Sequence, residues 1–286
     1  MALRVLPAAA RIARFAMNRR GMTSRFAEGP SSRVHVYDGE GGGKLPPIVM
    51  LHGLGSAGAA FAGVVAGIRP HVARVVIPEL PGHGFSPHPG GDRKITPSFL
   101  LDAVTSSLEQ TIDEPAIVFG SSLGGAMALK YAIHRPDRVR ALFLVSPAGA
   151  RITQDEQREL VRAFDVPGRR EAQVFLERLY HRPPWFLSLL AREFPDLLRT
   201  PAVREILESA TEEDAPRPEE LNALTMPILL LWGRSEKLLP ASALTYFRAN
   251  LPGHAVIEEP EGFGHTPQLE VPKRVAQRVV EFARQL

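Results

Sequence analysis

The chain has 286 residues and a mass of 31.3 kDa, which is enough for one large domain or two small ones. Hydrophobic residues make up 44% of it and charged residues 23%. These values are close to the averages of globular proteins and exclude disordered, collagen-like and coiled-coil architectures for the bulk of the chain. The chain contains no cysteine, which excludes disulfides, thiolate metal sites and a cysteine nucleophile.

Positive charge is concentrated near the N-terminus. The sequence pI is about 9.4, but the first 27 residues hold six arginines and no acidic residue. The whole chain carries a net charge of +3, so the remaining 259 residues carry a net charge of about −3. A nucleic-acid-binding domain needs a basic face on its folded body, so we expect no nucleic-acid partner.

Residues 1–30 are predicted to be a basic N-terminal segment, outside the main domain. No run of about 18 apolar residues is present, so we expect no transmembrane helix. Arginines alternate with apolar residues, which is not typical of a secretory signal. Drawn as a helix, the segment places Arg4, Arg11 and Arg14 on one side, which predicts a short interfacial helix on anionic lipid. The alternatives are a segment without fixed structure and a translation start at Met17 or Met22.

Short apolar runs, each ending at a turn signal, follow one another along the chain. They cover residues 47–51, 74–77, 116–119, 141–145, 228–232 and 255–257. Runs that are apolar at every position predict strands buried on both faces, as in a parallel sheet covered by helices. Helices are predicted between them, over residues 97–112, 123–134, 241–250 and 270–286. This alternation predicts an α/β fold whose ligand site lies at the carboxyl ends of the strands.

About 80 residues between 145 and 228 contain no pattern of a buried strand. A connection of this length should have structure of its own. Helices are predicted over residues 154–164, 170–179 and 202–209, interrupted by prolines. We therefore predict a helical cap over residues 151–222, inserted before the penultimate strand of a mostly parallel central sheet. The α/β core would comprise residues 31–150 and 223–286.

The sequence Gly120-Ser121-Ser122-Leu123-Gly124 is a Gly-x-Ser-x-Gly motif. It stands directly after a predicted strand and directly before a predicted helix, the context in which a serine is held in a strained turn. The glycines remove side chains that would collide there, and the helix N-terminus offers N–H groups to a developing oxyanion. The spacing indicates Ser122 as the nucleophile and Ser121 as its neighbour only.

A serine nucleophile needs a histidine to accept its proton and a carboxylate to orient that histidine. Of the nine histidines, His265 stands after the last predicted strand and before the last helix, so we expect it to be the base. The acid should follow the strand over 228–232, where the loop offers Glu236. The loop after the strand over 141–145 offers no carboxylate. The alternative for Glu236 is a solvated pair with the neighbouring Lys237.

The oxyanion donors are predicted from two loops. An enzyme with this serine turn takes one donor from the residue after the serine and another from an earlier loop. His52-Gly53-Leu54-Gly55 ends the first predicted core strand. We expect the N–H groups of Leu54 and Leu123 to be these donors; the alternative for residues 52–55 is an ordinary glycine turn.

These motifs together resemble the α/β-hydrolase superfamily. The correspondence runs from about residue 46 to the C-terminus, with Pro-Gly-His-Gly-Phe-Ser at 81–86, Trp-Gly-x-x-Glu at 232–236 and Gly-His at 264–265 beside the motifs above. Gly-Ser-Ser-Leu-Gly-Gly followed by Val-Ser-Pro-Ala-Gly, behind a basic N-terminal segment, is similar to the lipase and monoacylglycerol-lipase branch. The acid position holds Glu236 where this superfamily usually has aspartate.

We expect a serine hydrolase that cleaves carboxylic esters through an acyl-enzyme intermediate, without a metal or cofactor. The resemblance implies a lid over an apolar pocket and a small-molecule ester or lipid as partner, either an acyl-glycerol or a medium-chain acyl ester. The alternatives are a C–C bond hydrolase or a cofactor-free perhydrolase of the same fold, and a non-catalytic binding protein. We expect a cytoplasmic location, with membrane association through the N-terminal segment; the sequence does not determine the oligomeric state.

Overall fold

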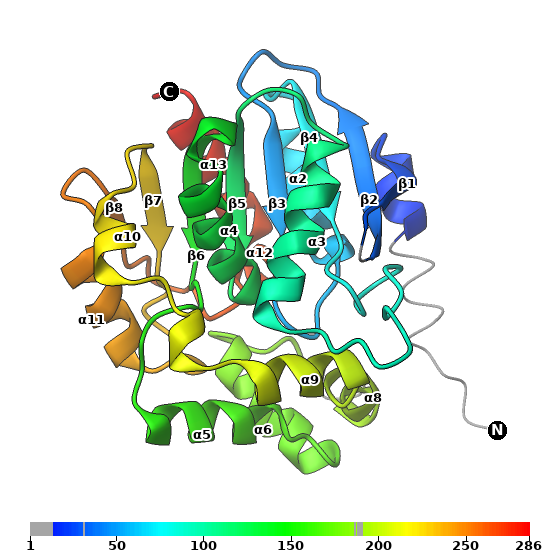
Figure 1. Ribbon diagram of the computed structural model, residues 1–286, viewed down its shortest axis with the longest axis vertical. Helices are drawn as coiled ribbons and strands as arrows, with labels where there is room; N and C mark the ends of the chain where they lie inside the picture. The colour runs from blue at the N-terminus through cyan, green and yellow to red at the C-terminus, as the bar shows by residue number, and fades with distance from the viewer. Residues whose placement is uncertain (1–13, 31, 186, 188–190) are drawn as a thin grey trace.

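A computed structural model describes residues 14–30, 32–185, 187 and 191–286. Within them, eight strands form one sheet in the order β1-β2-β4-β3-β5-β6-β7-β8 (Figure 1). The strands are β1 (Thr23–Glu28), β2 (Arg33–Glu40), β3 (Ile48–Leu51), β4 (Arg74–Pro78), β5 (Ala116–Ser121), β6 (Val139–Val145), β7 (Ile228–Leu231) and β8 (Val256–Glu258). All neighbouring pairs from β4 to β8 are parallel, which confirms the predicted α/β fold.

The first two strands were not predicted from the sequence. β1 pairs antiparallel with β2, and β2 pairs antiparallel with β4. β2 is buried over six positions although it contains His35 and Asp38, because Asp38 is paired with Arg25 and Arg74 on the two adjacent strands. Because these polar residues interrupt the apolar run, the sequence pattern does not predict a buried strand here. β1 also extends the sheet into residues 23–28, which belong to the segment predicted to lie outside the main domain.

Helices cover both faces of the sheet, as Figure 1 shows. α2 (Ala62–Ile68) and α13 (Pro272–Ala283) lie on one face, and α3 (Pro97–Glu109), α4 (Leu123–His134) and α11 (Ala241–Asn250) lie on the other. In β5, Val118 packs into one layer while Ile117 and Phe119 pack into the other. The parallel strands are therefore buried on both faces, and their carboxyl ends converge on one rim.

The edge strand β8 departs from this pattern. Its neighbour on one side is β7, and Val256 is 49% exposed. The apolar run over residues 255–257 correctly predicts a strand, but the prediction that both of its faces are buried is wrong. A strand at the end of the sheet lacks the second neighbour and the full helix cover that bury the central strands.

In the described residues between β6 and β7, all regular secondary structure is helical. It contains α5 (Gln154–Phe164), α6 (Arg169–Leu179), η3 (Ala191–Glu193), α8 (Phe194–Leu198), α9 (Pro201–Ser209), η4 (Glu212–Asp214) and α10 (Pro218–Asn222). α5 begins at a capping box formed by Thr153 and Glu156. The rings of Phe164 and Phe175 lie 5.2 Å apart in a small apolar cluster that joins α5 to α6. Figure 1 shows α5, α6, α8 and α9 beneath the carboxyl ends of the parallel strands. We refer to residues 151–222 as the cap.

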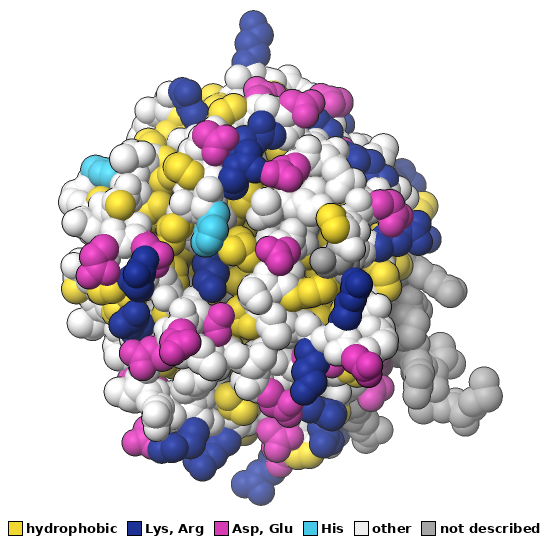
Figure 2. Space-filling view, viewed as in Figure 1, with side chains coloured by type: hydrophobic (Ala, Val, Ile, Leu, Met, Phe, Trp, Pro, Cys, Tyr) yellow, Lys and Arg dark blue, Asp and Glu magenta, His cyan; other side chains and the backbone are white. Residues whose placement is uncertain are grey.

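Shorter helices complete the core: η1 (Gly58–Phe61), η2 (Pro136–Arg138) and α12 (Pro267–Glu270). At the N-terminus, residues 14–19 are helical, with Met17 fully buried against the core. The predicted interfacial helix lies in part on residues 1–13, outside the described residues. No helix in the described part of the chain has both the length and the apolar character needed to cross a bilayer. Basic and acidic side chains are interspersed over the face shown in Figure 2, so this face is not a basic surface.

Candidate active site

Ser122 occupies the turn between β5 and α4. Its backbone has φ 53° and ψ −120°, and Ser122 and Ser146 are the two non-glycine residues with positive φ in the described chain. Such a conformation is costly and persists only when its surroundings enforce it. The Ser122 N–H donates to the carbonyl of Val145 (3.1 Å), and the Ser122 carbonyl accepts from the N–H groups of Gly125 (2.8 Å) and Ala148 (2.9 Å). The hydrogen bonds therefore fix this strained turn to the end of β6.

The glycines two residues before and after Ser122 lie in close contact with backbone atoms. A Cβ added at Gly124 would lie 2.1 Å from the carbonyl oxygen of Leu51, and one added at Gly120 would lie 2.5 Å from the carbonyl oxygen of Gly124. Neither site can accept a side chain without moving main-chain atoms. The start of α4 therefore packs directly on the end of β3, as the motif predicts.

Glu236 and His265 meet at the same rim, from loops that follow β7 and precede α12. The His265 Nδ1 lies 2.8 Å from Glu236 Oε2, and both side chains are almost fully buried, with exposures of 2% and 3%. The other carboxylate oxygen of Glu236 accepts the N–H groups of Leu238 (2.8 Å) and Leu239 (3.0 Å). Both carboxylate oxygens thus have partners, which is the requirement for burying a charge.

The environment of Glu236 favours the ionised carboxylate. Burial raises its pKa, but His265 and the N–H of Leu239 act in the opposite direction and hold the pKa below its usual value. An ionised carboxylate accepts a hydrogen bond from the Nδ1–H group, so the neutral imidazole keeps Nε2 as the atom able to take up a proton. The solvated Glu236–Lys237 pair, the alternative from the sequence, does not form; Glu236 faces His265 instead.

Among these described residues, Glu236 and His265 are hydrogen-bonded to each other, whereas the Ser122 hydroxyl is not hydrogen-bonded to His265. In such enzymes the distance between the serine hydroxyl and the histidine is often too long for a hydrogen bond before substrate binds, and it shortens during the reaction. A different bond joins the two regions: the Gln268 amide donates to the Ser121 hydroxyl (3.1 Å), and both side chains are buried. Gln268 is not among the residues predicted from the sequence; the one sequence signal that points to it is its place three residues after His265.

The loop at residues 52–55 lies against the serine. A Cβ added at Gly53 would lie 3.1 Å from Ser122 Cβ and 3.7 Å from Ser122 Oγ. His52 holds this loop through Nδ1 to the Gly53 carbonyl (2.9 Å), and its Nε2 accepts the N–H of Leu80 (3.0 Å). Burial lowers the pKa of His52, so the ring remains neutral and both bonds persist. The structure thus brings the backbone next to Leu54 close to Ser122.

Leu123 is the first residue of α4. Its N–H therefore lacks the acceptor that a residue within the helix would have four positions earlier. It also lies at the positive end of the helix dipole. These properties suit it to stabilise negative charge beside Ser122.

An apolar cavity of about 160 Å³ lies between α4 and the cap; Leu123, the residue after Ser122, lines it, whereas Ser122, Glu236 and His265 do not. Leu123, Ala126 and Met127 line it from α4, and Leu160 and Val161 line it from α5. The residues from α4 are spaced at three to four positions, so they form one face of the helix leading away from Ser122. An acyl chain is the kind of group that this lining can bury.

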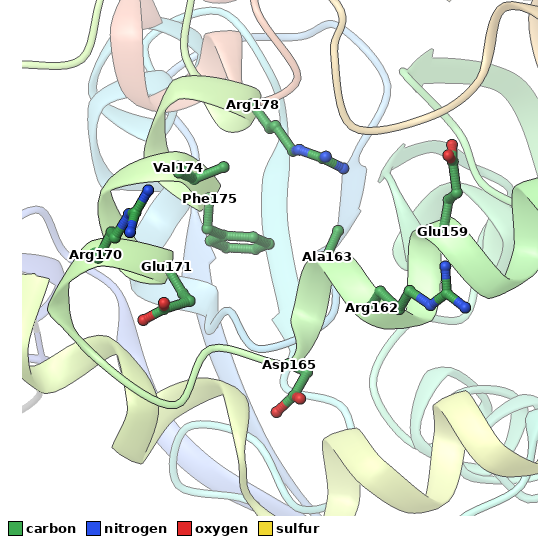
Figure 3. Close-up of a pocket in the computed structure, with 9 residues that line it drawn as sticks. All are labelled: Glu159, Arg162, Ala163, Asp165, Arg170, Glu171, Val174, Phe175 and Arg178. Carbon is green, nitrogen blue, oxygen red and sulfur yellow. The ribbon is translucent and has the colours of Figure 1, made fainter.

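A second hollow lies on the cap between α5 and α6. This groove of about 290 Å³ is lined by charged side chains of both signs, with Phe175 at its base (Figure 3). All of its lining residues belong to the cap, and none belongs to the rim of the sheet that carries Ser122 and His265. We therefore assign the reacting centre to the rim of the sheet and not to this groove.

Comparison with known proteins identifies the family of this chain. Residues 46–272 match the family model described as the alpha/beta hydrolase fold, and the chain belongs to this family. A pimeloyl-acyl-carrier-protein methyl ester esterase of Neisseria meningitidis serogroup B is 30% identical over 235 residues, which cover 78% of this chain and 86% of that protein. The same kind of enzyme from Vibrio vulnificus is 28% identical, covering 78% of this chain and 93% of that protein.

Among solved structures, that of a membrane phospholipase A superposes with a TM-score of 0.83 at 22% identity, covering 99% of this chain and 94% of that one. At this level of identity the likeness concerns the fold. The family and its esterase relatives place the chain among the carboxylic ester hydrolases.

Proposed function

We propose that the chain hydrolyses carboxylic esters through an acyl-enzyme formed on Ser122, with His265 as general base and acid and Glu236 as the group that orients the imidazole. The observation that carries this proposal is the buried, hydrogen-bonded Glu236–His265 pair at the rim where the strained Ser122 turn lies. A buried ionised carboxylate bound to a histidine supplies the base that a serine hydroxyl needs.

The reaction follows from these positions. Ser122 Oγ attacks the ester carbonyl carbon while His265 Nε2 takes up the hydroxyl proton. The N–H groups of Leu54 and Leu123 donate to the carbonyl oxygen as it becomes an oxyanion; each such donor is typically worth about 10²–10³ in turnover. The C–O bond to the alcohol breaks, and the alcohol leaves with the proton from His265. Water then attacks the acyl-enzyme by the same route and releases the carboxylic acid.

For the substrate, we propose an ester with a medium-chain acyl group, such as an acyl-glycerol. The apolar cavity between α4 and the cap supports this choice, because it starts at Leu123 and continues along one face of α4. Lys130 and Asp214, 3.7 Å apart, also line it and provide polar groups among the apolar ones. The relatives named for a methyl ester of a pimeloyl group on a carrier protein support a second candidate, an acyl methyl ester.

We further propose that the N-terminal segment brings the enzyme to anionic lipid from the cytoplasmic side. Six arginines lie within the first 27 residues, and Phe15 is 61% exposed on the described part of this segment. The guanidinium of Arg14 stacks on Phe85 at 4.8 Å, and Met17 is buried. The segment therefore leaves the core from a fixed point, and a neighbouring fold belongs to a membrane phospholipase.

The decisive experiment is active-site labelling. A fluorophosphonate probe should label the native chain at Ser122, identified by mass spectrometry of the modified peptide, and should not label Ser122→Ala. Turnover of a nitrophenyl ester should fall by roughly 10⁴–10⁶ in the same variant, by analogy with other serine triads. Ser121→Ala is the matched control and should still be labelled.

Further activity assays distinguish ester hydrolysis from the alternatives, which are C–C bond hydrolysis, perhydrolysis and non-catalytic binding. A panel of nitrophenyl, methyl and glycerol esters of increasing acyl length, run beside a diketone substrate for C–C cleavage and a peroxide assay for perhydrolysis, ranks the three reactions. Ester cleavage should be the fastest. Hydrolysis of none of the esters, with no labelling of Ser122, would favour a non-catalytic binding protein and overturn the proposal.

A further inference from the structure

The cap contacts the loop that bears His265 through residues 179–182, at the end of α6 and just after it. The carbonyl oxygen of Leu179 accepts the main-chain N–H of His265 (2.8 Å) and that of Thr266 (3.2 Å). The Thr266 hydroxyl also points to this oxygen, at 3.3 Å. The main chain of the proposed base is therefore bonded to the cap, whereas its side chain is bonded to Glu236 of the core.

One carboxylate joins the same two segments a second time. Glu270 Oε2 accepts the N–H of Gly264 (3.0 Å), and Glu270 Oε1 accepts the N–H of Arg182 (3.1 Å). Gly264 permits this close approach, because a Cβ there would lie 2.5 Å from the N of His181 and 2.7 Å from the Glu270 carboxylate. Glu270 thus holds the residue before His265 and the end of the cap segment at a fixed separation.

The cap segment also reaches the loop that bears the acid. His181 Nδ1 lies 2.6 Å from the hydroxyl of Ser235, the residue before Glu236. The N–H of Ser235 in turn donates to the carbonyl of Phe263, two residues before His265 (3.0 Å). Residues 179–182 are therefore bonded to both loops whose relative position sets the Glu236–His265 contact.

We propose that Glu270 is a positioning residue for the hydrolysis, which through Gly264 and the cap segment 179–182 fixes His265 between Glu236 and Ser122. The inference rests on the proposed function, since it assigns His265 the role of the base. The two bonds to Glu270, at 3.0 and 3.1 Å, are of ordinary length; an ionised acceptor makes such bonds stronger than bonds between neutral groups, so together they restrict the position of the loop. A shift of about 1 Å in a catalytic group costs on the order of 10² in rate. Displacement of the cap at this point would therefore lower turnover even though the cap supplies no reacting atom.

The test compares Glu270→Ala and Glu270→Gln with the native chain on a short nitrophenyl ester, which needs little of the acyl cavity. We expect Glu270→Ala to lower kcat by about 10²-fold with KM changed less than threefold, and the rate of fluorophosphonate labelling at Ser122 to fall in parallel. Glu270→Gln should be intermediate, because the two N–H groups bind different carboxylate oxygens and the amide keeps one oxygen but puts an NH2 donor in place of the other.

A matched control lies on the same loop. Glu261 is an exposed carboxylate paired with Arg234, and Glu261→Gln should leave kcat and labelling unchanged. Hydrogen exchange distinguishes positioning from general loss of stability. In Glu270→Ala, the amides of 179–182 and 264–266 should exchange faster together, while those of β5 and β6 keep their protection.

Native kcat in folded Glu270→Ala would overturn the inference, as would a kcat loss that tracks the melting temperature and is equal in the Ala and Gln variants. Neither result would affect the labelling of Ser122 in the native chain. Failure of the inference is thereby distinguishable from failure of the proposed function. If Glu270→Ala does not fold, His181→Ala removes the bond to Ser235 alone. That variant should lower kcat by several-fold with KM unchanged, and a native kcat would count against the role of the segment.

Discussion

The amide of Gln268 donates to the hydroxyl of Ser121, 3.1 Å away, across 147 positions of sequence. This bond joins the short helix that follows His265 to the turn that presents Ser122. Both side chains are buried, so the bond has little competition from water. It is a direct side-chain connection between the proposed base and nucleophile regions.

Removing this connection should lower activity without abolishing it. Gln268→Leu loses the donor while keeping apolar bulk, and we expect kcat/KM to fall up to about tenfold, the worth of one net hydrogen bond. Ser121→Ala should have a similar effect. In the double variant the two losses should not add, because both remove the same interaction; full additivity of the two losses would argue against a shared role.

The charge of Glu236 should matter more than its size. Glu236→Gln keeps the shape but offers an amide to His265, and we expect kcat to fall by about 10³–10⁴ with little change in KM, as when the acid of other triads is neutralised. Glu236→Asp keeps the charge but shortens the reach by one methylene, so its loss should be much smaller. Lys237→Ala is the neighbouring control. A native rate in Glu236→Gln would show that the buried pair is only structural.

Stability should depend on pH through His83. Burial, and then the nearby His52, lower the pKa of His83 to about 4, whereas the unfolded value is about 6.5. Between about pH 4 and pH 6.5 the unfolded chain binds a proton at His83 that the folded chain does not. The free energy of unfolding therefore falls as the pH falls through this range, by about 1.4 kcal/mol per pH unit for this group. Urea unfolding at pH 7 and pH 4.5 measures it.

His83→Gln should flatten this dependence by about 2–3 kcal/mol over the same interval, because the group that the unfolded chain protonates is gone. His134→Gln, on an exposed residue at the end of α4, is the control and should leave the slope unchanged. Equal slopes in the native chain and His83→Gln would mean that His83 takes up its proton in the folded state.

Asp38 should stabilise the edge of the sheet above its unfolded pKa. Burial raises the pKa of Asp38, but the hydrogen bonds from Arg74 and Arg25 outweigh burial and hold it below the usual value. This stability is present above about pH 4 and is lost as the pH falls through the folded pKa. We expect Asp38→Asn to cost about 1–3 kcal/mol at pH 7, since both arginines are partly exposed.

The difference in unfolding free energy between the native chain and Asp38→Asn should shrink when urea unfolding is repeated near pH 3. Asp155→Asn serves as the comparison, because Asp155 is 87% exposed in its pair with Arg158. A penalty for Asp38→Asn that is the same at pH 7 and pH 3 would show that the carboxylate charge contributes nothing.

Deletion of residues 1–13 should weaken binding to anionic vesicles and leave hydrolysis of a soluble nitrophenyl ester unchanged. The deletion removes Arg4 and Arg11 but keeps Met17, which is buried in the core. At about 1 kcal/mol for each arginine near an anionic surface, the affinity should fall roughly 30-fold in sedimentation with vesicles containing phosphatidylserine. Vesicles of phosphatidylcholine alone are the control; unchanged partitioning would eliminate the membrane role of this segment.

Local sequence determined the parts of the molecule that depend on neighbouring residues. The apolar runs predicted the five strands from β3 to β7, because strands covered on both faces must be apolar at every position. The run over 255–257 also predicted β8, although this edge strand is not buried on both faces. The pattern around Ser122 predicted the turn, because only glycine at positions 120 and 124 avoids contact with main-chain atoms. The order of the motifs then indicated which loops would carry the acid and the base.

The tertiary structure decided what depends on partners far apart in the chain. The sequence around Glu236 is equally compatible with an exposed ion pair, and only the fold buries it against His265. β2 was concealed because Asp38 takes its counterions from β1 and β4. The hydrogen bonds accepted by Glu270 and Leu179 also join residues far apart in the chain. They could not be predicted, because the local sequence does not indicate which main-chain N–H group will approach a given acceptor. The spacing of apolar residues along the sequence indicates whether a segment forms a helix or a strand, whereas the packing of these elements determines which side chains become neighbours.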